Sequence, residues 1–241
     1  MTTREYLEVL NSSCAERCAE TNYWTPARRP NMRLLYSTPE TFEPPARILW
    51  LGKNPGGEPD DGDRHPHDVP FRQRRGWSSY LDDDWGRFRR GEHPMQRGVL
   101  AAASLFAGGA DEGRALLRSS PAANLSPYRS RSWDYLPRDL RDISVGESLI
   151  RLAQPRVVVL FFSESSLWRR LMDTLDRAVP STRIRISGFP GYTFRESVCG
   201  ERPEYVFGLP GFNSQTSPHN ETVLKTLRER IALHDLSDGR A

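Results

Sequence analysis

Three short segments that combine side-chain amides with glycine and proline are the strongest candidates for chemistry in this chain. They are residues 52–57, 124–129 and 211–220. An amide can both donate and accept hydrogen bonds, so it can recognise the edge of a ligand or orient a water molecule. Glycine and proline restrict the loop that carries it. Because strong bases are scarce in these segments, the pattern predicts a site that works by positioning its reactants.

Each of the three segments follows an apolar run that reads as a strand. Residues 46–51 are apolar and end in Gly and Pro, residues 121–125 form a weaker strand candidate, and residues 204–209 form a third. If these strands are parallel, their carboxyl ends meet at one edge of the sheet, where open α/β sheets bind ligands. We therefore expect the three loops to build one site.

The remaining elements alternate between strands and helices. Residues 155–162 are β-branched and apolar, which is typical of a central buried strand, and residues 183–186 are a further strand candidate. Helices are predicted from the N-terminus to about Cys18, then over 95–106, 146–153, from a Ser163 cap to about Ala178, and over 220–233. This order predicts a three-layer α/β/α sandwich around a mostly parallel, four-stranded sheet.

The length of 241 residues favours one domain. We divide it into an N-terminal helix and irregular outer cover (1–45), an α/β core (46–233) and a frayed tail (234–241). The segment 57–67 is predicted to be an acidic loop rich in Gly and Pro.

Composition argues for a cytoplasmic protein without disulfide bonds. The mean hydropathy is -0.64, no apolar run approaches the roughly 18 residues of a membrane helix, and the first residues do not read as a secretory signal. The three cysteines are an odd number. Cys14 and Cys18 have neither iron-sulfur nor zinc spacing, so inert thiols are expected.

Positive charge is concentrated in one stretch of the chain, although the formal net charge is only +3. Arginines crowd residues 72–97 together with Trp77, Tyr80, Trp85 and Phe88. Arginines interleaved with aromatic rings suit a polyanion with exposed bases.

Four segments together resemble the motifs of uracil-DNA glycosylases. Residues 52–56 (Gly-Lys-Asn-Pro-Gly) resemble the Gly-x-Asn-Pro-Gly first motif of the mismatch-specific and single-strand-selective monofunctional branches. Residues 69–71 (Val-Pro-Phe) resemble a downstream segment of the single-strand-selective branch. Residues 124–127 are similar to its Asn-x-x-Pro, and residues 215–220 to its His-Pro-Ser-Pro-x-Asn. The motifs occur in the family's order within residues 46–233.

The resemblance implies hydrolytic removal of a base that is flipped out of DNA, without a metal or other cofactor. It implies that Asn54 holds the attacking water, that Phe71 stacks on the base, and that Asn124 and Gly52 contact the base. Gln215 stands where the family has a His that donates to the base carbonyl. The expected contacts to the DNA backbone are Ser217, Pro218, His219 and Asn220. The implied partner is single- or double-stranded DNA, with neither an obligate protein partner nor a membrane.

Two departures from the family pattern leave the substrate open. Gln215 is a weaker donor than an imidazole that can become charged. The loop after the first motif is longer than in the family and carries four acidic residues: Glu58, Asp60, Asp61 and Asp63. Excision of a hypermodified cytosine of phage DNA, such as glucosylated hydroxymethylcytosine, is therefore an alternative substrate class.

Other functions are alternatives to base excision. A DNA-binding module that has lost its chemistry is one, and a nucleotide-binding enzyme ranks last because the phosphate-loop and dinucleotide patterns are missing after the first strand. Lys53 as a Schiff-base nucleophile would need desolvation. A metal at His65, His67 and Asp68 lacks a fourth ligand at a telling spacing. Alone, the Asn54 segment could be a turn, Phe71 a core residue and Asn124 a cap.

Overall fold

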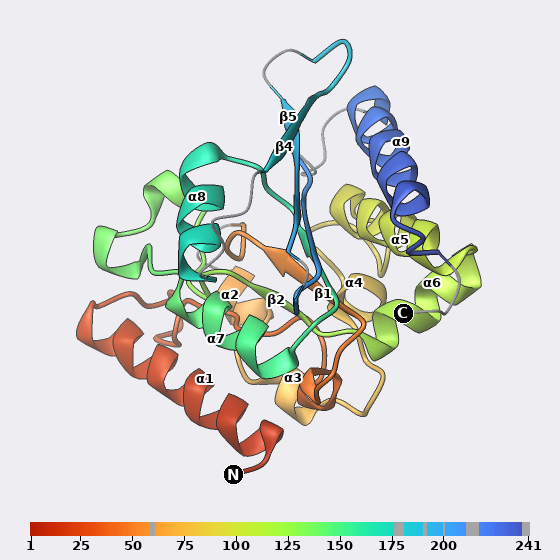
Figure 1. The fold of residues 1–241 in the computed structure, drawn as a ribbon. Helices are drawn as coiled ribbons and strands as arrows, with labels where there is room; N and C mark the ends of the chain where they lie inside the picture. The colour runs from red at the N-terminus through yellow and green to blue at the C-terminus, as the bar shows by residue number, and fades with distance from the viewer. Residues whose placement is uncertain (58–60, 176–180, 190–191, 200, 211–216, 238–241) are drawn as a thin grey trace.

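A computed structural model describes residues 1–57, 61–175, 181–189, 192–199, 201–210 and 217–237 (Figure 1). Its helices are α1 (Thr3–Glu20), α2 (Asp61–Arg64), α3 (Val69–Arg72), α4 (Ser79–Asp82), α5 (Pro94–Ala107), α6 (Ala110–Ser119), α7 (Ser144–Ala153), α8 (Ser165–Thr174) and α9 (Ser217–Leu233), with 3₁₀ turns at Pro39–Phe42, Trp133–Tyr135 and Arg138–Leu140. Its strands are β1 (Ile48–Gly52), β2 (Ala122–Asn124), β3 (Val157–Leu160), β4 (Thr182–Arg185), β5 (Thr193–Val198) and β6 (Tyr205–Gly208).

The described strands form one six-stranded sheet in the order β2-β1-β3-β6-β5-β4. The pairs β2-β1, β1-β3 and β3-β6 are parallel, whereas β6-β5 and β5-β4 are antiparallel. The predicted α/β fold with a mostly parallel sheet is confirmed, as is the inner position of β3. The predicted number of four strands is wrong: all five strand candidates belong to the sheet, and β5, which was not predicted, pairs β4 with β6.

Strand β5 was missed because its sequence is polar although most of it is buried. Glu196 is 1% exposed and accepts hydrogen bonds from Arg230 and from the His234 ring. Arg195 is 4% exposed and donates to the Ser163 carbonyl and the Ser165 hydroxyl. Burial of a charge is tolerated when it is paired. Hydrophobic alternation therefore could not reveal this strand.

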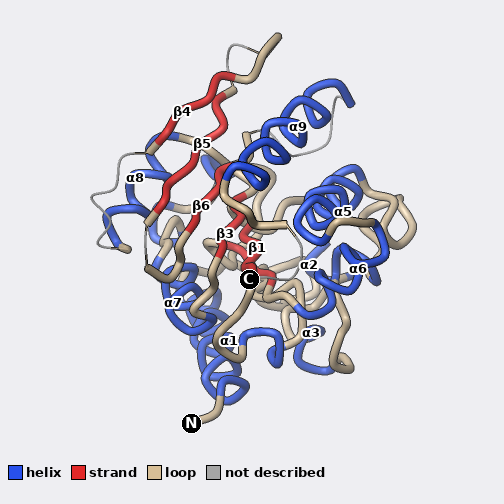
Figure 2. Tube along the Cα trace, turned by 45° about the vertical axis from the view of Figure 1, so that its right-hand side comes forward, coloured by secondary structure: helices blue, strands red, loops and turns tan. Residues whose placement is uncertain are grey.

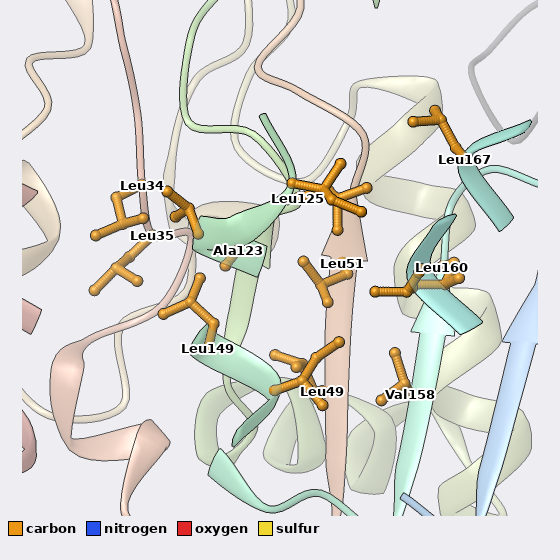
Figure 3. Packing of buried hydrophobic residues seen from close by; sticks show 14 of the residues in the cluster. Leu34, Leu35, Leu49, Leu51, Ala123, Leu125, Leu149, Val158, Leu160 and Leu167 are labelled. Carbon is orange, nitrogen blue, oxygen red and sulfur yellow. The ribbon is translucent and has the colours of Figure 1, made fainter. Parts of the chain in front are cut away.

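Helices cover both faces of the sheet, which gives three layers (Figures 1 and 2). Along β1, Leu49 and Leu51 pack into a core with α1, α7 and α8, part of which Figure 3 shows. Ile48 and Trp50 point the other way, into a core with α5, α6 and α9. Because side chains alternate along a strand, an apolar run buried on both faces requires helices on both sides.

The segment after α1 is part of the core, so its prediction as an outer cover is wrong. Met32, Leu34 and Leu35 are fully buried. Leu35 bridges to Ala123 of β2, and Met32 bridges to Tyr128. The segment therefore closes the β2 edge of the sheet.

Several boundaries also differ from expectation. Helix α6 was not predicted, α8 begins after Glu164 and ends at Thr174, and residues 176–180, where it was expected to continue, lie outside the described residues. The supposed tail begins in the core, because Leu236 is 2% exposed. No helix in the described ranges is long and apolar enough to cross a membrane.

The cysteines behave as expected from their spacing. Cys14 and Cys18 are free and buried against the core that α1 covers. Burial raises the pKa of the Cys14 thiol to about 11 and that of Cys18 to about 12. Both thiols therefore stay protonated and unreactive near neutral pH.

Candidate functional site

A cavity of about 520 Å³ opens at the carboxyl edge of β1, β2 and β3. Its lining comes from the ends of these strands and from the segments after them: the loop after β1, Asn124 and residues 129–133, and Phe161, Phe162 and Glu164. Arg33, Tyr36, Tyr80, residues 85–88, His93 and Met95 also belong to its wall. The predicted meeting of the first two loops at one sheet edge is confirmed.

The first two loops are held together by backbone hydrogen bonds. The Leu125 amide donates to the Gly52 carbonyl (2.8 Å), and the Ser126 amide donates to the Lys53 carbonyl (3.0 Å). Farther along, the Ser130 amide donates to the Pro55 carbonyl (2.9 Å). The register that pairs Gly52 with Asn124 thus continues beyond the strands, and the side chains on these loops have a fixed relative position.

Asn124 presents an unpartnered amide at the cavity. Its side chain is 4% exposed, and its Nδ2 is buried without a hydrogen-bond partner among the described residues. Its Oδ1 lies over Gly52, where an added Cβ would be 2.3 Å away. A buried donor without a partner costs free energy unless a ligand satisfies it. Because the Asn124 Oδ1 lies so close to Gly52, the residue at position 52 must be small for Asn124 to take this place.

Asn54 also lines the cavity, and two neighbouring backbone carbonyls fix the orientation of its side-chain amide. Its Nδ2 donates to the Pro55 carbonyl (3.1 Å) and to the Ser130 carbonyl (3.2 Å). These bonds use both hydrogens of the amide. The Oδ1 atom is left as an acceptor, which can hold a water molecule through one of its hydrogens.

The structure does not bring Phe71 to the cavity. It lies in α3 and packs against the core beside α1, and its carbonyl accepts a hydrogen bond of 2.5 Å from Arg4. It is not among the described residues that line the cavity. The Val-Pro-Phe pattern of residues 69–71 therefore marks a residue that packs against the core, and the prediction that Phe71 lies in the site is wrong.

Other aromatic residues line the cavity instead. The Tyr36 and Tyr80 rings stack with centroids 5.6 Å apart, and the Trp85 ring lies 5.7 Å from Tyr36 and 5.6 Å from Tyr80. Phe161 contacts Tyr80 edge-on at 6.1 Å. Tyr36 was missed because it precedes the first motif. For Tyr80 and Trp85, the sequence indicates only that they lie among the arginines of residues 72–97.

Two buried arginines give the cavity positive charge. Arg33 is 2% exposed and pairs with Asp83 at 2.7 Å, and its guanidinium lies 4.7 Å over the Tyr36 ring. Arg129 is 6% exposed, donates to the Gly56 carbonyl (2.7 Å) and has no carboxylate partner among the described residues. Burial lowers the pKa of Arg129. Sequence reasoning missed Arg33, which stands in no recognisable motif, and it did not single out Arg129, although Arg129 ends the candidate segment 124–129.

The acidic segment after the first loop is more ordered than predicted. It contains α2, and only Asp61 of its described acidic residues lines the cavity. Asp63 accepts hydrogen bonds from Thr25 and from the Ala27 amide (3.1 Å), so it fastens the segment to the N-terminal region. His65 lines the cavity, and burial lowers its pKa. The described residues contain no group of three or more metal-ligating side chains.

Lys53 forms an ion pair with Glu164, the residue before α8. Both side chains are partly exposed and line the cavity, so the pair joins the loops after β1 and β3. The ammonium is therefore held beside a carboxylate and is partly open to solvent, whereas a Schiff-base nucleophile needs a desolvated amine.

The last predicted motif is only partly described. Gln215 lies outside the described residues. Ser217, Pro218 and His219 form the first residues of α9, and Asn220 follows in the same helix. The Asn220 Oδ1 is buried without a partner among the described residues, and Asn220 does not belong to the described lining of the cavity.

Neither a scan against protein-family models nor a search of curated proteins gives a match for this chain.

Proposed function

We propose that this protein is a monofunctional DNA glycosylase of the uracil-DNA glycosylase type, which hydrolyses the N-glycosidic bond of a base flipped out of DNA. The observation that carries the proposal is the pair of amides, Asn54 and Asn124, held by interlocked loops in one cavity. Asn124 offers a buried donor without a partner, and Asn54 offers an acceptor. These are the two functions that base recognition and water activation require.

The reaction follows from these two groups. A flipped base enters the cavity because its glycosidic carbon cannot be reached inside the duplex. Asn54 Oδ1 accepts a hydrogen bond from a water molecule whose oxygen bonds to C1′. The C–N bond breaks, and its electron pair leaves with the base. The water proton is lost to solvent, and the products are an abasic sugar and the free base, protonated from solvent.

Donors aimed at the departing base stabilise its developing negative charge. We assign this role to Asn124 Nδ2, which is buried without a partner among the described residues, and to Gln215. The rings of Tyr80 and Trp85 supply the apolar surface on which a planar base stacks, a role that we transfer from Phe71.

The size of the cavity favours a second substrate class, a base with a bulky substituent. Its volume of about 520 Å³ lies within the roughly 300–1,000 Å³ of sites that hold drug-sized ligands, and a pyrimidine ring alone fills only part of it. Arg129 adds donors for an acceptor-rich substituent. Glucosylated hydroxymethylcytosine of phage DNA is such a base, and the hydroxyls of its glucose can accept hydrogen bonds from Arg129.

The test is a panel of single- and double-stranded oligonucleotides that carry uracil, deaminated purines and modified cytosines, together with glucosylated phage DNA. Alkali-induced strand breaks report excised positions, and mass spectrometry identifies the released base. We expect Asn54→Ala and Asn124→Ala each to lower the single-turnover rate by about 10²- to 10³-fold, the usual effect of removing one stabilising group.

Gln73→Ala is the matched control, because Gln73 is an exposed amide outside the cavity lining. Its rate should equal that of the unaltered protein. Salt-sensitive DNA binding without release of any base would overturn the proposal in favour of a non-catalytic DNA-binding module.

A further inference from the structure

A basic turn, residues 85–93, connects α4 to α5 at the mouth of the cavity. Trp85, Gly86, Arg87 and Phe88 all line the cavity. Gly86 and Arg87 are also exposed, so this part of the turn lies where the cavity meets solvent. The function of the two amides does not explain the charge of this turn.

The first half of the turn has a defined backbone. Trp85 and Phe88 exchange backbone hydrogen bonds of 3.2 and 3.1 Å, and Gly86 has a φ of 59°, which favours glycine. The Trp85 indole donates to the Ser79 hydroxyl (3.1 Å), and its ring lies 5.3 Å from the His93 ring. The turn is therefore anchored to α4 at one end and to the start of α5 at the other.

The arginines of the turn are exposed and lack acidic partners. Arg87, Arg89 and Arg90 form no ion pair with any described residue, whereas nearby Arg33 and Arg118 are paired with Asp83 and Asp82. The Arg87 guanidinium lies 5.5 Å over the Phe88 ring, a contact that holds the charge beside the mouth.

We propose that this turn binds the phosphates next to the flipped nucleotide. The inference rests on the proposed function. An extruded nucleotide remains attached to its strand, so the adjoining phosphates must pass the mouth of the cavity. Arginine binds phosphate oxygens with charge-assisted hydrogen bonds. A rigid loop loses less conformational entropy on binding than a mobile one.

The test compares two triple variants in DNA binding by fluorescence anisotropy across a salt series. The turn variant is Arg87→Gln, Arg89→Gln and Arg90→Gln. The control variant is Arg28→Gln, Arg114→Gln and Arg228→Gln, which removes three exposed arginines outside the cavity lining. The two variants carry the same net charge, so a difference between them reports position.

We expect the turn variant to bind at least tenfold more weakly than the control variant at 150 mM salt. Its slope of log affinity against log salt should be smaller by about 2 to 3, since each lost phosphate contact removes roughly 0.7–0.9. Under single-turnover conditions its half-maximal base release should need at least tenfold more enzyme than that of the control variant. Equal affinity and slope for the two variants would overturn the inference.

Failure of the glycosylase proposal would give a different set of results from failure of the phosphate-site inference. If the turn variant alone weakens DNA binding but the unaltered protein releases no base, the phosphate contact stands and the glycosylase proposal falls. If base release is unaffected by the turn variant at limiting enzyme, the glycosylase proposal stands and the turn is not its phosphate site. Absence of DNA binding overturns both.

Discussion

Gly52 leaves the space that the Asn124 amide occupies. We predict that Gly52→Ala lowers base release by about 10²-fold or more, the scale of losing one donor, because its Cβ would meet Asn124 Oδ1 at 2.3 Å. Single-turnover rates on the best substrate of the panel measure the effect. Gly56→Ala is the control, since an added Cβ there meets nothing within 4 Å. Full activity of Gly52→Ala would show that the position of Asn124 is unimportant.

A substitution of Phe71 should affect mainly stability, and a substitution of Trp85 should affect mainly base stacking. Phe71→Leu is predicted to lower the thermal midpoint while its saturated rate is preserved, because the ring packs on the core beside α1. Trp85→Leu is predicted to lower activity more than stability, because its ring lines the cavity and base–aromatic stacking contributes roughly 1–3 kcal/mol. The reverse pattern would restore Phe71 as the stacking residue.

The amides of the site could be predicted from the sequence, and its walls could not. Asn54 follows β1 closely and Asn124 ends β2, so the parallel arrangement of the two strands was enough to bring them together. Arg33 and Tyr36 reach the cavity through the packing of the N-terminal segment along β2, which leaves no periodic pattern. Arg129 lies in the loop after β2, whose backbone bonds to that segment at Asn31. Phe71 shows the converse, because a local match cannot tell whether a ring faces the cavity or the core.

At the scale of elements, the residue that caps the start of α5, His93, makes the free energy of unfolding depend on pH. The His93 ring accepts a hydrogen bond from the Met95 amide (3.1 Å), which requires a neutral ring. Burial and the nearby charge of Arg97 lower the pKa of His93. Protonation is therefore easier in the unfolded chain, so the stability from this group is complete above pH 6.5, its ordinary pKa, and is lost as the pH falls below that value.

His93→Asn should reduce this acid sensitivity. Asparagine caps helices well and does not titrate, so we expect a similar free energy of unfolding at pH 8 and a smaller loss between pH 6.5 and 5 than in the unaltered protein. Urea unfolding at several pH values measures it. His65 and His67 also have pKa values lowered by burial, so part of the loss should remain. An identical loss in both proteins would contradict the role of His93.

Elements were predictable where apolar residues alternate or run together. Strands β1 and β3 and helix α5 follow from such patterns. Strand β5 does not, because Arg195 and Glu196 are buried by pairing with residues distant in the sequence. Helix α6 was missed although Leu116 and Leu117 are buried on one side, since its remaining residues are small or charged.

At the scale of the whole molecule, Glu196 fastens the last helix to the sheet. Its side chain is 2% exposed and meets Arg230 and His234. We predict that Glu196→Gln lowers the free energy of unfolding by about 2–4 kcal/mol, as expected for losing one partner of a buried pair, with the lower part of the range favoured because Arg230 is 22% exposed.

Urea unfolding tests this prediction, with Glu229→Gln as the control on the exposed side of α9. The control should change stability by less than about 0.5 kcal/mol. Base release by Glu196→Gln should persist below its melting range, since Glu196 is not part of the cavity. Equal stability of the two variants would mean that the pair contributes no net free energy.

The two outermost strands of the described sheet, β2 and β4, differ in what lies beside them. The segment that bridges to Ala123 and Tyr128 covers β2. At the other end, β4 is the outermost of the described strands (Figure 1), and its Arg183 and Arg185 are exposed. A seventh strand would bring its side chains to within about 5 Å of these cations, and a second copy of β4 would meet them with its own. Charged edge strands resist such pairing. The charge of β4 therefore disfavours the addition of a further strand at this edge of the sheet.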